Sequence, residues 1–363
     1  MAWIAIMDRG CGQFDARSLD HPPETCATRV APEALLRRGT LMIEAQFSAQ
    51  PHPQTLLSFR HGMPHCGGFS LRALPRGGVV LAQNLGQDLR HCTIEQRDDA
   101  RADRVRICYS WDCDIGQARL SLEHLDTGEC LSVRMTDPHP MPLANLKMVT
   151  LAPSLREIDG DVRYVAIADH IHPLGPMPGI CATVPIATPE GPRPISQLRR
   201  GDQVLTACGK TAPVLQALRL TVPARGAFRP IRLRAPYYGL TEDIHLAPQE
   251  RLILSGSDVE YLFGTESVLL PTQHLVDQTS AFRAKSATLV TYHHLLLPRH
   301  QAVMAAGCPI ESLYIGRLRR KTRDLRESVL NHCDPQTLPE HAKPIWPVLR
   351  PYEAITLARW RAA

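Results

Sequence analysis

The sequence has no stretch that approaches the roughly 18 consecutive apolar residues that mark a membrane-spanning helix. Its opening segment, MAWIAIMDRGCG, lacks a basic region, and the apolar run stops at Asp8, so we expect no secretory signal peptide. These absences predict a soluble protein without a membrane span. They leave the compartment open between the cytoplasm and an export route that needs no such signal.

Several common motifs are also missing. The 11 cysteines include no C-x-x-C pair, so zinc ribbons and zinc fingers are not expected. The sequence contains no G-x-S-x-G, H-E-x-x-H, G-x-x-x-x-G-K-[ST] or G-x-G-x-x-G segment, which removes the basis for hydrolase, zincin and nucleotide-binding assignments. The net charge of +5 is spread along the chain, unlike the concentrated basic elements of nucleic-acid binders. We therefore expect no cofactor, no metal and no nucleic-acid partner.

The length of 363 residues suggests two domains, and one segment is suited to separate them. Residues 172–179 read HPLGPMPG, with three prolines and two glycines, a composition that sustains neither a helix nor a central strand. We therefore predict a first domain at 1–171, a linker at 172–180, a second domain at 181–316 and a tail at 317–363. In the tail, the apolar residues of RLRRKTRDLRESVLNHC recur at roughly helical spacing. A Pro-rich stretch and a short helix candidate, YEAITLARWRA, follow this segment.

The first domain is predicted to be an antiparallel sandwich, because short segments rich in β-branched and apolar residues alternate with Gly, Pro, Asp and Asn. The segments are GTLMIEAQF, TLLSF, GFSLRAL, GVVLAQ, RVRICYSW, ARLSLEHL and RYVAIADH. Their order resembles a concanavalin A-like (laminin G-type) jelly roll. The resemblance lies in the pattern more than in diagnostic residues.

Lectins of that architecture often bind sugar or calcium through loop Asp and Asn side chains. The candidates here are Asp112 and Asp114, which lie together, and Asn84 and Asp88, which lie elsewhere. Calcium needs six to eight oxygen ligands, and no dense D-x-D-x-N run supplies them. We therefore interpret these residues as solvated turn residues and leave a glycan or protein ligand open.

The second domain begins with a cysteine and continues in ordered blocks. CATVPIATPEGPRPISQLRRGDQVLTACGK is followed by PIRLRAPYYG, IHLAPQERLIL, LFGTESVLLPTQHLV, VTYHHLLLPRHQAVMAAG and PIESLYIG. These blocks resemble, in the same order, the Hedgehog/intein (Hint) domain in its bacterial Hint-2-like form. The resemblance covers about 135 residues from Cys181 to Gly316 and implies an all-β, horseshoe-like fold. The whole chain is thus expected to be mainly β with a short helical tail.

The resemblance implies a self-cleavage reaction in which the thiol of Cys181 attacks the carbonyl of Ile180 and converts the amide into a thioester. A thiol is a weak nucleophile until it is deprotonated. The departing nitrogen must also be protonated, which family members achieve with a T-x-x-H element. The substrate would be the chain's own N-terminal part, so any enzymatic activity would be a single turnover.

The sequence departs from the family at that element, which here reads Ala247, Pro248, Gln249 and Glu250. A methyl group replaces the hydroxyl, and a carboxyl replaces the imidazole. Glu250 serves as an acid only if burial raises its pKa well above about 4.3. His245 is a second candidate, although on an extended strand it would share a face with Ala247 and not with Glu250.

The C-terminal end departs as well. Splicing inteins end in a His-Asn pair before a Cys, Ser or Thr, whereas CPIES places Glu311 and Ser312 at that point. Without the asparagine amide the module cannot release itself by cyclisation, so we expect no splicing. His294 and His300 stand where the bacterial subgroup places histidines, in Y-x-H-L-L-x-x-x-H, and with His274 they are candidate bases or acids or else core histidines.

Three hypotheses follow for function. The first is autoprocessing by an N–S acyl shift at Ile180–Cys181 without splicing. The second is a catalytically inactive Hint scaffold joined to a sandwich that binds a glycan or a protein. The third is a cysteine peptidase that uses Cys181 and His300 on other proteins, which would require multiple turnovers.

Overall fold

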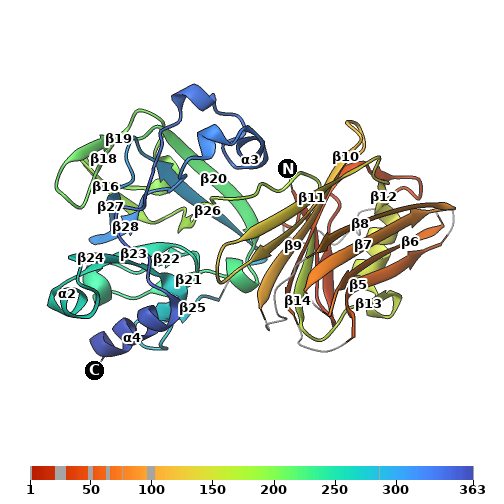
Figure 1. Cartoon of the computed structure of the whole chain (residues 1–363), viewed down its shortest axis with the longest axis horizontal. Coiled ribbons are helices and arrows are strands. Elements are labelled where there is room, and N and C mark those ends of the chain that lie inside the picture. Colours follow the sequence, from red (N-terminus) through yellow and green to blue (C-terminus); the bar gives the residue numbers. More distant parts are fainter. Residues whose placement is uncertain are drawn as a thin grey trace. The chain divides into compact units, whose positions relative to one another are not determined.

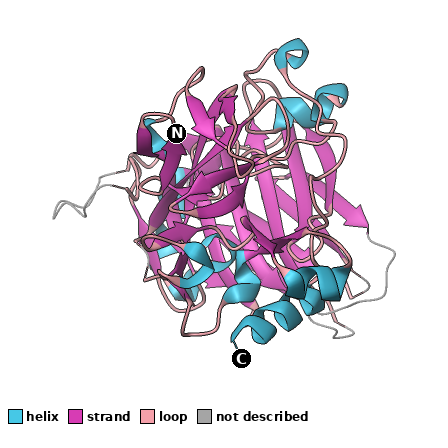
Figure 2. Ribbon diagram, turned by 90° about the vertical axis from the view of Figure 1, so that its left-hand side faces the viewer, coloured by secondary structure: helices cyan, strands magenta, loops and turns pink. Residues whose placement is uncertain are grey.

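The computed structural model describes residues 2–20, 30–47, 52–62, 66–75, 77–95, 103–285 and 287–362. It divides into two compact units, Met1–His172 and Pro173–Ala363 (Figure 1). Strands make up most of the regular structure in both units, and the helices are short (Figure 2). The predicted mainly-β fold is therefore confirmed.

The first unit is built from antiparallel sheets of seven and five strands. The larger sheet has the order β11-β10-β9-β4-β14-β1-β2 and the smaller one β13-β5-β6-β7-β8. The strands of the larger sheet are β1 Trp3–Met7, β2 Gly12–Phe14, β4 Arg38–Gln46, β9 Arg104–Asp112, β10 Gln117–His124, β11 Cys130–Thr136 and β14 Val162–Ala168. Those of the smaller sheet are β5 Gln54–His61, β6 Gly67–Ala73, β7 Gly78–Leu85, β8 Asp88–Glu95 and β13 Arg156–Glu157. The short strands β3 Leu35–Leu36 and β12 Met141–Pro142 pair with each other.

The main apolar core of this unit forms because alternate side chains of its strands point the same way. Strand β6 shows the alternation at Phe69, Leu71 and Ala73, which are buried between more exposed neighbours. Tyr109 and Trp111 on β9 stack at a centroid distance of 5.5 Å within the core. All seven sequence segments expected to be strands lie on strands of these sheets, while β1, β8, β11 and the helix α1 (Leu143–Leu151) had not been predicted.

The loop carboxylates considered for calcium are engaged with arginines. Asp114 lies 2.8 Å from Arg37, and Asp112 lies 3.5 Å from Arg38. Asp88 contacts Arg90 at 2.9 Å. These side chains form surface ion pairs of the turn regions.

The second unit contains two six-stranded sheets and a hairpin. One sheet, here called the cysteine sheet, has the order β20-β26-β15-β22-β21-β25, and the other has the order β17-β16-β27-β28-β23-β24. The strands of the cysteine sheet are β15 Ile180–Cys181, β20 Gln216–Pro223, β21 Ile231–Leu233, β22 Ile244–Leu246, β25 Ala281–Arg283 and β26 Leu289–Leu296. The others are β16 Pro185–Thr188, β17 Gly191–Pro194, β23 Arg251–Ser255, β24 Ser267–Pro271, β27 Ala302–Ala305, β28 Cys308–Glu311 and the hairpin β18 Gln203–Leu205 with β19 Thr211–Pro213.

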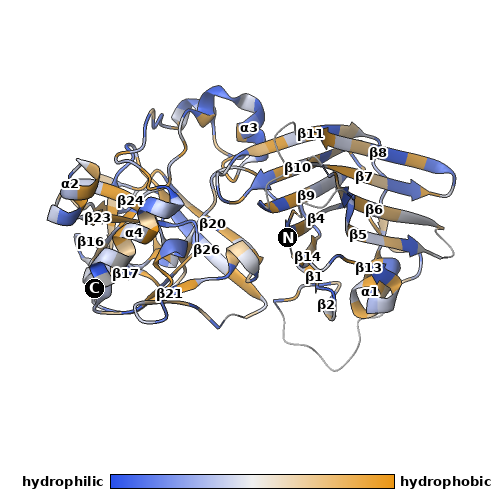
Figure 3. Ribbon diagram, turned by 60° about the horizontal axis from the view of Figure 1, so that its bottom comes forward, coloured by the Kyte–Doolittle hydropathy of each residue, from blue (hydrophilic) through white to orange (hydrophobic). Residues whose placement is uncertain are grey.

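The core of the second unit lies against one face of the cysteine sheet. Ile180, Leu246 and Ile231 occupy paired positions on three adjacent strands, and all are fully buried. Figure 3 shows the apolar character of the strands in this unit. His245 and Arg232 alternate with the core residues and lie on the opposite face of the sheet, whereas the partly buried Cys181 packs against the core.

The helical elements of the second unit are short. They are η2 Ile195–Gln197, η3 Gly226–Phe228, η4 Tyr237–Gly239, α2 Ser257–Phe263, η5 Thr272–Leu275, η6 Leu318–Arg320, α3 Thr322–Glu327, η7 Pro335–Thr337 and α4 Pro351–Ala362. The helix expected after Gly316 is shorter than its sequence pattern suggested. Ser328 ends α3 in an extended conformation, and its hydroxyl donates to the carbonyl of Leu325 and accepts the N–H of Leu330. In the described part of the chain, no helix has the length and apolarity to cross a membrane.

We expect Ile231→Ala to lower the free energy of unfolding by about 2–5 kcal/mol, because it opens a cavity in a fully buried layer of the sheet. The matched change Ile355→Ala, at a side chain 41% exposed on α4, should cost about 1 kcal/mol or less. Calorimetric unfolding of the full chain compares the two variants. Equal losses would contradict this placement of the core.

Candidate functional site

Cys181 lies in the middle of the cysteine sheet. Its two-residue strand is held on one side by the pairing of Ile180 with Leu246, and on the other by the pairing of Cys181 with Tyr292. The carbonyl of Gly179, just before this strand, accepts the backbone N–H of Ala247 at 2.7 Å. The peptide bond between Ile180 and Cys181 is therefore fixed in position by strands on both sides.

The thiol of Cys181 is largely buried, and burial raises its pKa to about 12. Tyr292 packs beside it and donates its hydroxyl to the carbonyl of Phe228 at 2.8 Å. Burial raises the pKa of Tyr292, and the charges of Cys181 and Glu250 raise it further. Tyr292 is thus the residue paired with Cys181 on the neighbouring strand.

Glu250 reaches this site because the chain turns sharply after β22. Its backbone N–H donates to the carbonyl of Ala247 at 3.0 Å. The buried hydroxyl of Thr272 donates to the same carbonyl at 2.6 Å, and the N–H of Thr272 donates to the carbonyl of Glu250 at 2.9 Å. The expectation of an extended strand through residue 250 is therefore wrong, and the turn brings Glu250 back toward the segment that precedes Cys181.

The carboxyl of Glu250 lies directly against Gly179. A methyl group added to Gly179 would come within 2.1 Å of Oε2 of Glu250. The side chain is buried, so desolvation raises its pKa well above the ordinary value, and the negative charge of Glu311 raises it further. At neutral pH this arrangement favours a protonated, uncharged carboxyl beside the cleavage segment.

His294 is the nearest identified imidazole to this carboxyl. Its Nε2 lies 3.5 Å from Oε1 of Glu250. Burial lowers the pKa of His294 to about 4, against the opposing effect of Glu311. The directions of the two pKa shifts favour the uncharged form of each partner.

His300 and Glu311 form a separate cluster. Nε2 of His300 lies 2.9 Å from Oε1 of Glu311, and Nδ1 accepts the backbone N–H of Ile345 at 2.9 Å. Arg251 lies 3.2 Å from the same carboxylate. Burial alone would raise the pKa of Glu311, but the hydrogen bond from His300 and the charge of Arg251 lower it overall. Nδ1 of His300 is therefore hydrogen-bonded to the backbone, and Nε2 faces the carboxylate of Glu311.

The remaining candidates lie outside the immediate surroundings of Glu250. The hydroxyl of Ser312 accepts the N–H of Gln301 at 3.0 Å. His245 is half-buried on β22 and lines a pocket with basic residues, and His274 is part of η5, where it contacts Gln273. The structure thus gathers Glu250 and His294 beside Gly179, two residues before Cys181, and leaves the other candidates in structural contacts.

Gly179, Thr272 and Tyr292 contribute to this geometry and had not been identified from the sequence. Gly179 leaves the space that the carboxyl of Glu250 fills, and Thr272 fixes the turn that carries it. Gly179 is the position that the sequence could have indicated, because it immediately precedes the residue whose carbonyl is attacked. Nothing in the local pattern around Thr272 points to a contact with a segment 25 residues earlier.

The family model of the Hint domain matches residues 178–317. This part of the chain therefore contains a Hint domain, which encloses Cys181 and every other residue of the gathered site. No curated protein matches the chain.

Solved structures resemble each unit weakly. The MchDnaB-1 intein is 15% identical, with a TM-score of 0.26 over 37% of this chain and 98% of the intein. An intein-like domain from Clostridium thermocellum is 14% identical, with a TM-score of 0.24 over 38% of this chain and 99% of that domain. The CBM40 of the Ruminococcus gnavus IT-sialidase, bound to α2,3-sialyllactose, is 16% identical, with a TM-score of 0.28 over 38% of this chain and 77% of that one. Likenesses of this size carry no argument about function.

We expect Gly179→Ala to destabilise the protein by about 1–3 kcal/mol, because the new methyl group overlaps the carboxyl of Glu250. Thermal unfolding of chains that also carry Cys181→Ala measures the cost without interference from cleavage. Repeating the substitution in a Glu250→Ala background should remove at least half of it. An unchanged cost in that background would contradict the contact.

The raised pKa of Glu250 predicts a pH-dependent stability. The contribution of its proton is fully present below the unfolded value of about 4.5 and is lost as pH rises toward the folded pKa. Glu250→Gln lacks this loss, so its melting temperature relative to the parent should increase steadily from pH 4.5 to pH 8. Calorimetry in the Cys181→Ala background tests this, and a constant difference across that range would show that the carboxyl is ionised.

Proposed function

We propose that the chain cleaves itself once, between Ile180 and Cys181, with the thiol of Cys181 as nucleophile and the neutral carboxyl of Glu250 as the acid. The observation that carries the proposal is the placement of a buried, protonatable carboxyl against Gly179, the residue that precedes the attacked Ile180. A general acid at this place would donate the proton that the imidazole donates in other members of the family. The substrate is the chain's own residues 1–180.

The bond changes balance within the site. The sulfur of Cys181 attacks the carbonyl carbon of Ile180, and the C–N bond of the peptide breaks as a C–S bond forms. The nitrogen of Cys181 gains one proton, donated by Glu250, while the thiol loses one. Glu250 recovers its proton from solvent, so the shift from amide to thioester involves no net change in protons.

Glu311 assists this chemistry electrostatically. Arg251 and His300 keep it ionised, and its negative charge opposes the ionisation of Glu250. The residue that occupies the position of a splicing histidine would then act as a positioning group that keeps the acid protonated. Hydrolysis of the thioester by water would release residues 1–180 and return the proton to the sulfur of Cys181. Glu311 and Ser312 supply no amide to cyclise, so no splicing would follow.

A second candidate function is an inactive Hint scaffold joined to a ligand-binding first unit. The observation in its favour is that burial raises the pKa of Cys181 to about 12, and no neighbouring cation lowers this pKa. The replacement of the family's hydroxyl by the methyl group of Ala247 agrees with it. In this alternative, residues 1–171 would bind a glycan or a protein, and the second unit would only support them.

Intact-mass measurement of the full chain with and without hydroxylamine separates these functions. We expect hydroxylamine to produce fragments 1–180 and 181–363 from the parent, and Cys181→Ala to produce none. Glu250→Gln should slow fragment formation by about 100-fold or more, because an amide group of nearly the same shape cannot donate the proton as an acid.

His332→Gln provides the matched control, since His332 is exposed in the turn that follows α3 and exchanges one polar side chain for another outside the proposed site. It should cleave at the parental rate. A parent chain of unchanged mass under every condition would overturn self-cleavage. If Ala247→Thr with Glu250→His then gains cleavage, the module is an inactive scaffold that the family residues restore.

A further inference from the structure

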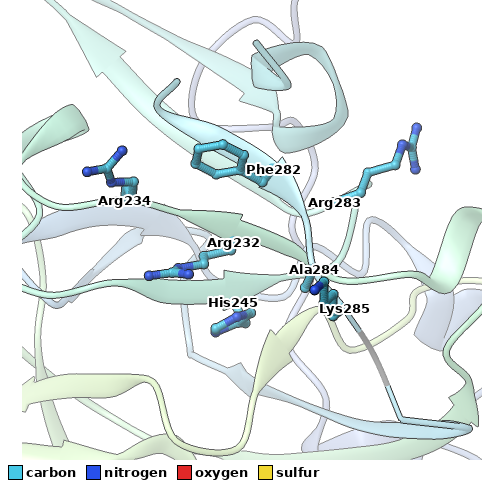
Figure 4. Close-up of a pocket in the computed structure, with 7 residues that line it drawn as sticks. All are labelled: Arg232, Arg234, His245, Phe282, Arg283, Ala284 and Lys285. Atoms are coloured by element: carbon cyan, nitrogen blue, oxygen red, sulfur yellow. The ribbon is translucent and has the colours of Figure 1, made fainter. Parts of the chain in front are cut away.

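The second unit has a basic pocket of about 620 Å³ over strands β22, β21 and β25 of the cysteine sheet. Figure 4 shows the side chains that line it, with Arg232, Arg234 and Phe282 directed to one side and Arg283 extending the other way. The lining residues are Arg232, Arg234, His245, Phe282, Arg283, Ala284 and Lys285.

The pocket lies over strands next to the one that carries Cys181. Arg232 on β21 pairs with His245 on one side and with Phe282 on the other, so these three side chains form a row across the strands. On the next strand, Ile180 pairs with Leu246, which places the following residue, Cys181, opposite His245. Neighbouring strands are about 4.8 Å apart. The backbone at residue 181 is therefore one strand away from His245, at the edge of the pocket.

The pocket carries an excess of positive charge. Arg232 is compensated by Asp243, whose carboxylate accepts its guanidinium hydrogen bond at 2.8 Å. For Arg234 and Lys285, by contrast, no carboxylate of the described residues lies within ion-pair distance. Burial lowers the pKa of His245, and the charge of Arg232 lowers it further against the opposing effect of Asp243. The lowered pKa favours the uncharged ring. The excess positive charge of the pocket thus comes from the exposed side chains of Arg234 and Lys285.

We propose that this pocket binds the anionic group of a small acyl acceptor, a nucleophilic amine that also carries a carboxylate or a phosphate, and presents it to the thioester at Ile180. The proposal rests on the self-cleavage function given above. It adds a substrate class: the thioester would be transferred to a negatively charged amine in preference to water.

The transfer is balanced as follows. The nitrogen of the acceptor attacks the carbonyl carbon of Ile180, and the C–S bond to Cys181 breaks. One proton passes from the nitrogen to the sulfur. The products are residues 1–180 joined by an amide to the acceptor and residues 181–363 with a free thiol, so no oxidant or other reactant is needed.

L-Cysteine and cysteamine test this selectivity in the full chain, because both trap a thioester through a thiol and an amine but only cysteine carries a carboxylate. We expect cysteine to cleave the parent about tenfold faster than cysteamine at equal low concentration. This factor corresponds to the free energy of one additional hydrogen bond that involves a charged group. The ratio should approach one as sodium chloride rises to 1 M, because salt screens the exposed charges. A ratio near one at low salt would overturn the proposal.

Arg234→Gln combined with Lys285→Gln should bring the cysteine-to-cysteamine ratio close to one. The matched control is Arg317→Gln with Lys343→Gln, which removes the same charge from two exposed positions of the same unit outside the pocket. It should retain the parental ratio. Loss of selectivity in both double variants would indicate a general effect of net charge and would count against the pocket.

Calorimetric titration of Cys181→Ala with inorganic phosphate measures the pocket independently of cleavage. We expect binding that the Arg234→Gln, Lys285→Gln pair weakens at least tenfold and that the control pair preserves. If phosphate binds in this way while hydroxylamine cleaves nothing, self-cleavage fails and the anion site stands. If hydroxylamine cleaves the chain but phosphate does not bind, the acceptor proposal fails and self-cleavage stands.

Discussion

The turn between β22 and β23, fixed by Thr272, is the constraint on which the site depends. Hydrogen bonds from the hydroxyl and the backbone N–H of Thr272 hold the carbonyls of Ala247 and Glu250. Without that turn, Glu250 would follow the strand direction and point away from the segment before Cys181. The fully buried Thr272 therefore determines where the carboxyl lies, although it takes no part in the chemistry.

The protonation state of Glu250 depends on a second layer of charges. Arg251 follows Glu250 in the sequence, but its guanidinium lies 3.2 Å from the carboxylate of Glu311. The positive charge of Arg251 therefore lowers the pKa of Glu311. The negative charge of Glu311 then adds to the effect of burial on Glu250. Since His300 is engaged by Glu311 and by the backbone of Ile345, the conspicuous histidine of the sequence motif stabilises this charge arrangement.

The sequence was sufficient for the mainly-β fold and for the seven predicted strand segments of the first unit, because alternation and turn residues are local signals. Its ordered blocks were also sufficient to indicate the Hint match in the second unit. It was insufficient where contacts join distant segments. The turn that brings Glu250 back depends on Thr272, and the short α3 depends on hydrogen bonds of Ser328. The assignments of Cys181, His245, His274, His294 and His300 to roles in cleavage stay predictions.

Replacing an imidazole by a buried carboxyl changes the conditions under which an acid can work. A histidine in water titrates near neutral pH and needs little help, whereas a carboxyl is an acid at neutral pH only while burial is preserved. The same burial that raises the pKa of Glu250 also raises the pKa of Cys181 to about 12, so the site keeps the acid protonated but disfavours the thiolate nucleophile. Cleavage would then be slow at neutral pH and would accelerate with rising pH until Glu250 ionises. Two groups buried in one site thus set opposite limits on its rate, and a slow single turnover is the chemistry that such a site can sustain.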